Sequence, residues 1–168
     1  VTILQTTFEY VTMEQKEKIC GKIIENVEKL INDKYGNYTI QMIILLNEEN
    51  LNSKIFKYIT ENLVNLSIQK FSSNVLDKFI INNNNYSLKL IDEIVNKNLI
   101  KDLIFDKYGN YVIQKALLKS DDNTQIIMFK LLNPIIRQLQ CLPFGQKLLN
   151  KLFNLYPKLS HCILNITG

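Results

Sequence analysis

The apolar residues of this chain recur at helical rather than alternating spacing. In four places apolar or β-branched side chains occupy positions i, i+1, i+4 and i+5, which lie on one face of a helix. These groups are Thr39, Ile40, Ile43, Ile44; Val75, Leu76, Phe79, Ile80; Val112, Ile113, Ala116, Leu117; and Leu148, Leu149, Leu152, Phe153. Residues 51–66, 88–103 and 124–139 carry further helical periodicity, and polar turns such as residues 82–85 lie between helices. The pattern predicts an all-α protein.

The chain also repeats itself. Residues 33–41 and 106–114 read Asp-Lys-Tyr-Gly-Asn-Tyr-x-Ile-Gln, and they differ only in having Thr39 in one and Val112 in the other. Related segments occur between and after them, and they align on an aromatic residue. The aromatic positions are Tyr35, Phe71, Tyr108 and Phe144, which are 36, 37 and 36 residues apart. A period of this length is typical of helical repeats that bury their apolar faces only by stacking.

We therefore expect an α-solenoid, a single stacked domain over residues 1–168. Its predicted parts are a partial repeat at 1–32, repeats at 33–68, 69–105 and 106–141, and a terminal capping half-repeat at 142–168. Projecting the period back from Asn37 places a truncated copy at the first residue of the chain, so we expect the chain to be an excerpt of a longer array.

Three positions of each repeat stay polar and fall on the side of the helix opposite the apolar residues. In successive repeats they are Asn37, Tyr38, Gln41; Ser73, Asn74, Asp77; and Asn110, Tyr111, Gln114. We expect the three side chains of each triplet to project together and to form one rung of a ladder along a continuous surface. A face that is merely solvated gives no reason for Asn-Tyr-x-x-Gln to recur unchanged, or for Tyr to stay in solvent.

The chemistry of the triplets fits single-stranded nucleic acid. Asn and Gln each combine a donor and an acceptor, which complements the mixed edge of a nucleobase, and a flat ring between rungs can stack on base faces. A stacked base and a bidentate edge contact are each worth about 1–3 kcal/mol. Several rungs would therefore bind tightly without a high net charge. Lys34, Lys70 and Lys107, just before the aromatic positions, would either neutralise phosphates or remain in solvent.

Composition and charge narrow the class of protein. The 168 residues carry 20 Lys+Arg against 16 Asp+Glu, and 46% are hydrophobic, which fits one mildly basic domain with a core. No apolar run approaches the roughly 20 residues of a membrane-spanning helix, so we expect no membrane association. The three cysteines, Cys20, Cys141 and Cys162, show no disulfide or zinc spacing and favour a reducing, intracellular setting.

Nothing in the sequence supports an enzyme. It has no phosphate-binding loop, dinucleotide fingerprint or serine nucleophile motif. The single histidine, His161, stands beside Cys162 without further ligands at metal-site spacing. We expect no catalytic residues, no metal and no cofactor.

These repeats resemble those of the Pumilio (PUF) family of RNA-binding proteins over essentially the whole chain. The order of the triplets, Asn-Tyr-x-x-Gln, Ser-Asn-x-x-acid and Asn-Tyr-x-x-Gln, is similar to the carboxy-terminal half of the family's repeat domain, in which the RNA runs antiparallel to the protein. The resemblance implies that each repeat reads one base. An Asn and Gln pair would read uracil, Ser with an acid would read guanine, and the middle residue would stack.

Carried over, the resemblance implies a 5′-UGU-3′ core. Asn110 and Gln114 would hold the 5′ uracil with Tyr111 stacking. Ser73 and Asp77 would hold the guanine beside Asn74, and Asn37 and Gln41 with Tyr38 would hold the next uracil. The nine triplet residues are therefore the predicted RNA-binding residues.

The chain departs from the family pattern in three places. Asp77 stands where the guanine-reading repeat usually has Glu, and its shorter side chain has about 1.5 Å less reach. At the amino end, Val1, Thr2 and Gln5 would face the following base as in adenine-tolerant repeats, which makes Thr2 and Gln5 further candidate RNA-binding residues, but Thr2 supplies no ring. The last copy, with Gln146, Lys147 and Asn150, resembles the terminal half-repeat that caps the solenoid, where we expect no base reading.

The resemblance implies a monomeric, non-catalytic protein that binds single-stranded RNA in 3′ untranslated regions of messenger RNA. It would act in translational repression or mRNA decay in the cytoplasm, with repressor or deadenylase proteins on its convex face. Two alternatives stay open. One is a nucleolar relative that acts in ribosome assembly and depends less on base identity, and the other is an armadillo-like scaffold that binds proteins.

Overall fold

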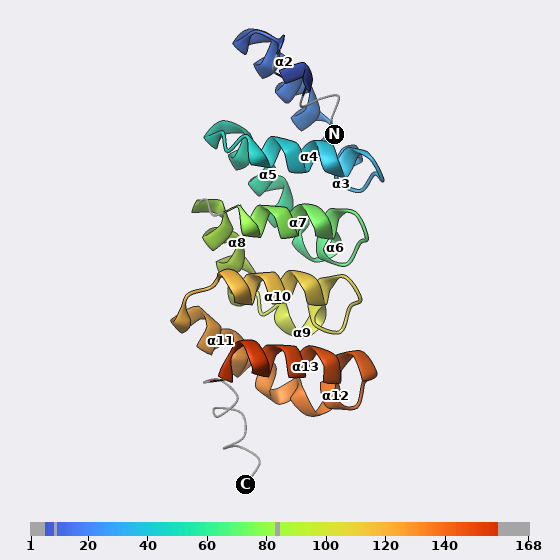
Figure 1. The fold of residues 1–168 in the computed structure, drawn as a ribbon, viewed down its shortest axis with the longest axis vertical. Coiled ribbons are helices and arrows are strands. Elements are labelled where there is room, and N and C mark those ends of the chain that lie inside the picture. The colour runs from blue at the N-terminus through green and yellow to red at the C-terminus, as the bar shows by residue number, and fades with distance from the viewer. Residues whose placement is uncertain (1–5, 9, 83–84, 158–168) are drawn as a thin grey trace.

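The computed structural model describes residues 6–8, 10–82 and 85–157, and every regular element among them is a helix. The helices form successive units of a long, a short and another long helix (Figure 1). Their bounds are α2 (Met13–Glu25), α3 (Val27–Ile31), α4 (Gly36–Leu45); α5 (Glu49–Glu61), α6 (Leu63–Ser67), α7 (Ser72–Ile81); α8 (Asn85–Asn96), α9 (Ile100–Leu103), α10 (Gly109–Lys119); and α11 (Asp122–Leu132), the 3₁₀ helix η1 (Asn133–Ile135), α12 (Ile136–Gln140), α13 (Pro143–Leu155). The predicted α-solenoid is confirmed over the described residues.

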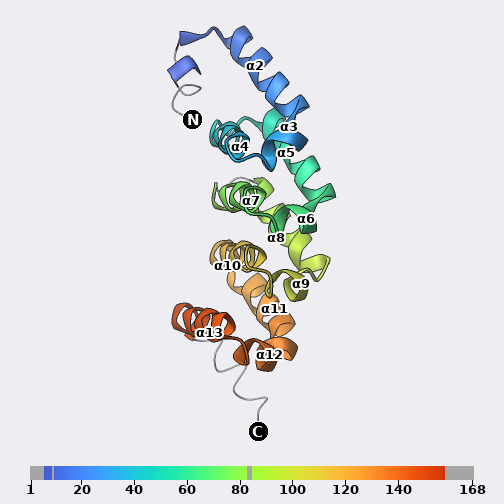
Figure 2. The same ribbon diagram turned by 90° about the vertical axis from the view of Figure 1, so that its right-hand side faces the viewer.

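The units stack so that equivalent helices form layers (Figure 2). The last helix of each unit, α4, α7, α10 and α13, lies in one layer, and the remaining helices form the other. Within the first layer α4 packs on α7 and α7 on α10, while α5 packs on both α2 and α8 in the second. The surface of the layer of α4, α7, α10 and α13 is called the candidate face below.

The core lies between the two layers and continues from unit to unit. The predicted apolar positions of α4, α7, α10 and α13 are buried there, with Ile40, Phe79 and Ile113 fully inaccessible. Thr39 and Phe153, at the margins of the predicted groups, are only partly buried. Each unit therefore covers the apolar surface of the next, as the helical spacing predicted.

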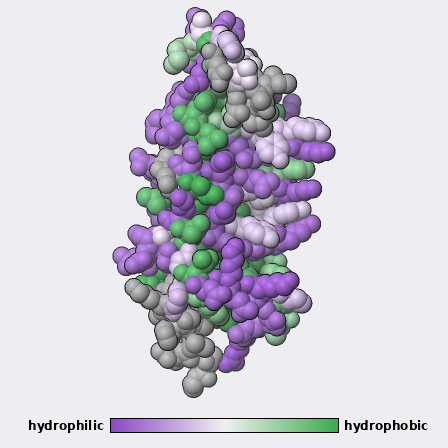
Figure 3. Space-filling view, in the orientation of Figure 1, coloured by the Kyte–Doolittle hydropathy of each residue, from purple (hydrophilic) through white to green (hydrophobic). Residues whose placement is uncertain are grey.

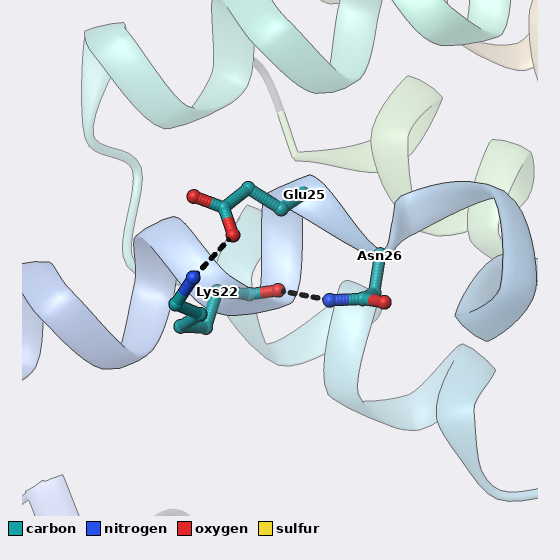
Figure 4. Close-up of polar contacts among 3 residues, drawn as sticks. All are labelled: Lys22, Glu25 and Asn26. Atoms are coloured by element: carbon teal, nitrogen blue, oxygen red, sulfur yellow. Dashed lines mark hydrogen bonds and ion pairs between the residues drawn. The ribbon is translucent and has the colours of Figure 1, made fainter.

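The second layer differs from the sequence pattern in that each long periodic segment is broken into a long and a short helix. Asn62 lies at the junction of α5 and α6, where its Nδ2 donates to the Tyr58 carbonyl at 3.0 Å. Asn26 does the same between α2 and α3, donating to the Lys22 carbonyl at 2.9 Å beside the Lys22–Glu25 ion pair (Figure 4). In the later units the breaks have other causes. Asn98, between α8 and α9, adopts a left-handed φ of 52°, and a proline lies in η1, between α11 and α12.

The invariant Asp and Gly of the two matching segments have a structural role in the turn before α4 and α10. Asp33 Oδ1 accepts hydrogen bonds from the backbone N–H groups of Tyr35 and Gly36 at 2.9 and 2.6 Å, and these donors lower the pKa of Asp33. A Cβ on Gly36 would lie 2.7 Å from the carbonyl oxygen of Leu30, so the close approach of two backbones requires glycine there. Asp106 accepts the equivalent hydrogen bonds from Tyr108 and Gly109, and a Cβ on Gly109 would lie 2.7 Å from the carbonyl oxygen of Leu103.

Among the described helices, none combines the length and the apolar character that crossing a bilayer requires.

Candidate RNA-binding face

The three triplets lie on α4, α7 and α10, in the first turns of neighbouring helices of one layer (Figure 1). The space-filling view of this side shows mostly hydrophilic side chains, interrupted by smaller hydrophobic patches (Figure 3). The middle residue of each triplet reaches solvent. Tyr38 is 50% exposed, Tyr111 is 59% exposed, and Asn74 is also exposed. The predicted exposure of these two rings and this amide is therefore confirmed.

The first residue of each triplet is buried, which the helical pattern did not predict. Asn37, Ser73 and Asn110 are only 1, 7 and 8% exposed. The cause is the turn before each helix, whose carbonyl groups fold over the first helical turn and accept hydrogen bonds from these side chains. Asn37 Nδ2 donates to the carbonyls of Asp33 and Lys34 at 2.9 Å each, and Asn110 Nδ2 donates to the Asp106 carbonyl at 2.7 Å.

In α4 and α10 the side chain of the buried asparagine holds the glutamine of the same triplet by a hydrogen bond. Gln41 Nε2 donates to Asn37 Oδ1 at 2.9 Å, and Gln114 Nε2 donates to Asn110 Oδ1 at the same distance of 2.9 Å. This bond uses one of the two N–H groups of each glutamine. The other N–H and the Oε1 atom of Gln41 remain as an adjacent donor and acceptor, whereas Gln114 Oε1 also accepts from Lys151 Nζ and keeps one lone pair for a further donor. An adjacent donor and acceptor match a base edge that offers an N–H beside a carbonyl, as uracil does.

The middle rung has different electrostatics because it holds a carboxylate. Asp77 Oδ2 lies 3.7 Å from Lys115 Nζ of α10, and Asp77 Oδ1 is buried without a hydrogen-bond partner among the described residues. Burial raises the pKa of Asp77, and the nearby Lys115 ammonium and, less strongly, Lys78 act in the opposite direction. An ionised carboxylate accepts but does not donate, so this rung suits a base edge that presents two donors.

The layer opens between α10 and α13 into a groove of about 470 Å³. It contains the triplet of α10 together with Lys107, Phe144, Lys147 and Leu148, and with two residues that the sequence analysis did not select, Phe105 and Lys151. Lys151 Nζ donates to Gln114 Oε1 at 2.7 Å. The sequence contains a pattern that could have identified Lys115 and Lys151. A lysine directly follows the last triplet position in three repeats, as Lys78, Lys115 and Lys151.

The lysines before the aromatic positions stack on those rings. The Nζ atoms of Lys34, Lys70 and Lys107 lie 5.2, 5.4 and 4.8 Å from the ring centroids of Tyr35, Phe71 and Tyr108. These distances fit cation–π contacts. The contacts hold one ammonium group in the same place at the start of each of the three helices.

The remaining predicted residues divide into two groups. Gln146, Lys147 and Asn150 of the last copy are exposed on α13, and Gln146 Nε2 donates to the Gln140 carbonyl. Thr2, Gln5, His161 and Cys162 lie outside the described residues. Within the described ranges, no group of three or more His, Cys, Asp or Glu side chains is placed to hold a metal ion.

A family model described as Pumilio-family RNA binding repeat matches residues 3–24, 26–44, 62–95 and 100–132. The chain belongs to the Pumilio family. Its PUF repeats account for the stacked three-helix units and for the polar triplets at equal positions in each unit.

Curated relatives carry the same repeats. Pumilio homolog 12 of Arabidopsis thaliana is 32% identical over 151 residues, which cover 89% of this chain and 25% of the relative. Pumilio homology domain family member 4 of Saccharomyces cerevisiae is 38% identical over 122 residues, covering 68% of this chain and 14% of the relative. The chain thus spans a quarter or less of the length of these relatives.

Solved PUF structures have the same fold. The Puf4 RNA binding domain, bound to an HO endonuclease RNA 3′ UTR recognition sequence, superposes with a TM-score of 0.77 at 31% identity, covering 89% of this chain and 49% of that one. The Puf3 RNA binding domain gives a TM-score of 0.79 at 24% identity over 94% of this chain and 44% of that one. The chain corresponds to about half of such a domain.

Proposed function

We propose that this chain binds single-stranded RNA with a 5′-UGU-3′ core, one base per PUF repeat, and that it regulates messenger RNAs through their 3′ untranslated regions. The observation that carries the proposal is the repeated amide pair on α4 and α10. The Asn-to-Gln hydrogen bond has the same length in both repeats, and each pair lies beside an exposed tyrosine.

The base at each rung follows from the donors and acceptors that the side chains leave available. Gln41 retains one N–H and its oxygen, and Gln114 retains one N–H and the oxygen lone pair that Lys151 does not use. Each set can pair with the N3–H and a carbonyl of uracil. Asp77 offers only acceptors when ionised, and guanine presents its N1–H and N2–H side by side. The similar Puf4 RNA binding domain is bound to a 3′ UTR recognition sequence, which supports the class of target.

Fluorescence anisotropy with short labelled RNAs at fixed salt tests the proposal, because salt changes the phosphate contribution to every affinity. We expect an RNA with a UGU core to bind at least about tenfold more tightly than one with adenine in place of guanine, since one lost bidentate edge contact is worth about 1–3 kcal/mol. Equal affinities would contradict the proposal and favour a relative that acts in ribosome assembly. No RNA binding would favour a protein-binding scaffold.

The proposal extends to the setting of the activity. Repressor or deadenylase proteins would bind the surface of the second layer, which the RNA does not occupy, and the chain would act as a monomer in the cytoplasm. Imaging of a fluorescent fusion would test the location, and nucleolar enrichment would support the ribosome-assembly alternative instead.

A further inference from the structure

The carboxylate of Asp77 lacks the partners that an ionised group usually has. Its Oδ1 is buried without a hydrogen-bond partner among the described residues, and its Oδ2 is 3.7 Å from Lys115 Nζ. Ser73, on the same rung, directs its hydroxyl to the Lys70 carbonyl, not to the carboxylate. A partly buried charge of this kind persists only where an opposite charge compensates for its desolvation.

Lys115 comes from the next repeat. It lies on α10, directly after Gln114, and it reaches back to the rung on α7. Lys151 holds the same position on α13, and it reaches back to Gln114 on α10 with an Nζ–Oε1 distance of 2.7 Å. Two successive repeats therefore use a lysine to contact the last member of the preceding triplet. Only the first of these contacts is made to a group that can be protonated.

Charged groups near Asp77 come from its own helix, α7, and from the neighbouring helix α10. The charged groups that act on the pKa of Asp77 are Lys115 on α10 and Lys78 on its own helix. The sequences of α4 and α6 contain no Asp, Glu, Lys or Arg, and Lys89, Asp92 and Glu93 of α8 belong to the other layer. The other titratable groups on the neighbouring helices of the candidate face are Tyr38, Tyr111 and Lys119.

We propose that Lys115 is a positioning residue for the middle rung: it holds the Asp77 carboxylate from the adjacent repeat and thereby sets the preference for guanine at that base. This inference rests on the proposed UGU recognition. The terminal torsion of an aspartate is broad, so the carboxylate can turn toward a base while the ammonium stays beside it. Guanine would then donate its N1–H and N2–H to the two carboxylate oxygens, of which Oδ1 has no hydrogen-bond partner among the described residues.

The lysine acts through the charge state of its partner. The neutral acid carries an O–H donor and no longer offers two acceptors to guanine. Burial raises the pKa of Asp77, and Lys115 lowers it. Without Lys115, the carboxylate would therefore take up a proton at a higher pH than in the original chain. Guanine preference should then fall at mildly acidic pH and return as the pH is raised.

The experiment compares the original chain with Lys115→Met by anisotropy, using RNAs that differ only in the middle base, between about pH 5.5 and 8. We expect the original chain to keep its guanine preference to a lower pH than the variant. In Lys115→Met we expect the ratio of affinities to drop by about threefold or more at the acidic end and to recover toward pH 8. Lys151→Met is the matched control, because it removes the same charge at the same position but faces a neutral amide. It should lower the affinity for all RNAs alike and leave the preference for the middle base independent of pH.

The outcomes separate the two proposals. If the original chain shows no guanine preference at any pH, both the proposed function and this inference fail. If it shows the preference and Lys115→Met keeps the same ratio at every pH, the inference alone is wrong. Tighter guanine binding by Lys115→Met would also overturn it, because the lysine would then compete with the base for Asp77. Circular dichroism of each variant confirms that the helices are intact.

Discussion

At the scale of single residues, the two outer rungs combine a buried amide with an exposed ring. Asn37 is almost inaccessible, yet its amide holds Gln41, and Tyr38 between them is half exposed. Burial of the first residue is useful for recognition because a glutamine tied at one N–H loses less rotamer freedom when a base arrives. The helical pattern alone could not predict this burial, since it depends on where the preceding turn places its carbonyl groups.

Exchange of the middle rung tests whether the triplets carry base identity. In the double substitution Ser73→Asn and Asp77→Gln we expect the preference at the middle base to change from guanine to uracil. The Gln69 and Lys70 carbonyls precede α7 as the Asp33 and Lys34 carbonyls precede α4, so the new asparagine has acceptors available. Competition between RNAs with G, U, A or C at that position measures the change. Unchanged guanine preference would show that this rung does not read the base.

At the scale of the elements, α4 and α10 of the candidate face begin where two backbones come close. Gly36 and Gly109 allow the carbonyls of Leu30 and Leu103 to approach the first turn of α4 and α10. In the unit between them Ser72 takes this place, and its hydroxyl donates to the Leu66 carbonyl at 2.6 Å. The close approach sets the direction of the helix start, and with it the direction of the rung that follows.

Alanine at this contact should therefore destabilise the chain. A Cβ on Gly109 would lie 2.7 Å from the backbone oxygen of Leu103, and relieving such a clash typically costs about 1–3 kcal/mol. Gly21, within α2, is the matched control because a Cβ there meets nothing within 4 Å. We expect Gly21→Ala to raise stability by about 0.5–1 kcal/mol and Gly109→Ala to lower it. Urea unfolding followed by circular dichroism measures both, and equal midpoints would contradict the role of the contact.

At the scale of the whole molecule, the stack makes the rungs separate units on one surface. Each repeat contacts mainly its neighbours, so a change on α4 has no direct route to α10. The formal charge of +4 is small, so under the proposed function base contacts must contribute much of the affinity for RNA.

Independence of the outer rungs predicts additive losses. We expect Tyr38→Ala and Tyr111→Ala each to weaken binding of a UGU RNA by about tenfold, the loss of one stacked base, with little change in stability because both rings are at least half exposed. The double variant should lose the sum of the two binding free energies to within about 0.5 kcal/mol. Anisotropy titrations of all four proteins test this. A loss much smaller than the sum would show that the two tyrosines act on the same base or on a common conformational change.

The sequence by itself determined the repeat, the helical class and the exposure of the two tyrosines. The nine-residue match and the regular spacing of aromatic residues require stacked helices, because one repeat cannot bury its apolar face alone. The exposure of Tyr38 and Tyr111 follows from the same periodicity, since they lie opposite the apolar stripe.

Only the tertiary structure decided what each rung offers to a ligand. The breaks at Asn26 and Asn62, the burial of Asn37 and Asn110, and the contact of Lys115 with Asp77 all depend on groups that the chain brings together across turns or between repeats. Hydrogen bonds and charge pairs of this kind depend on atomic distances that helical periodicity does not encode. The donors and acceptors left free at each base are therefore set by packing and not by residue type alone.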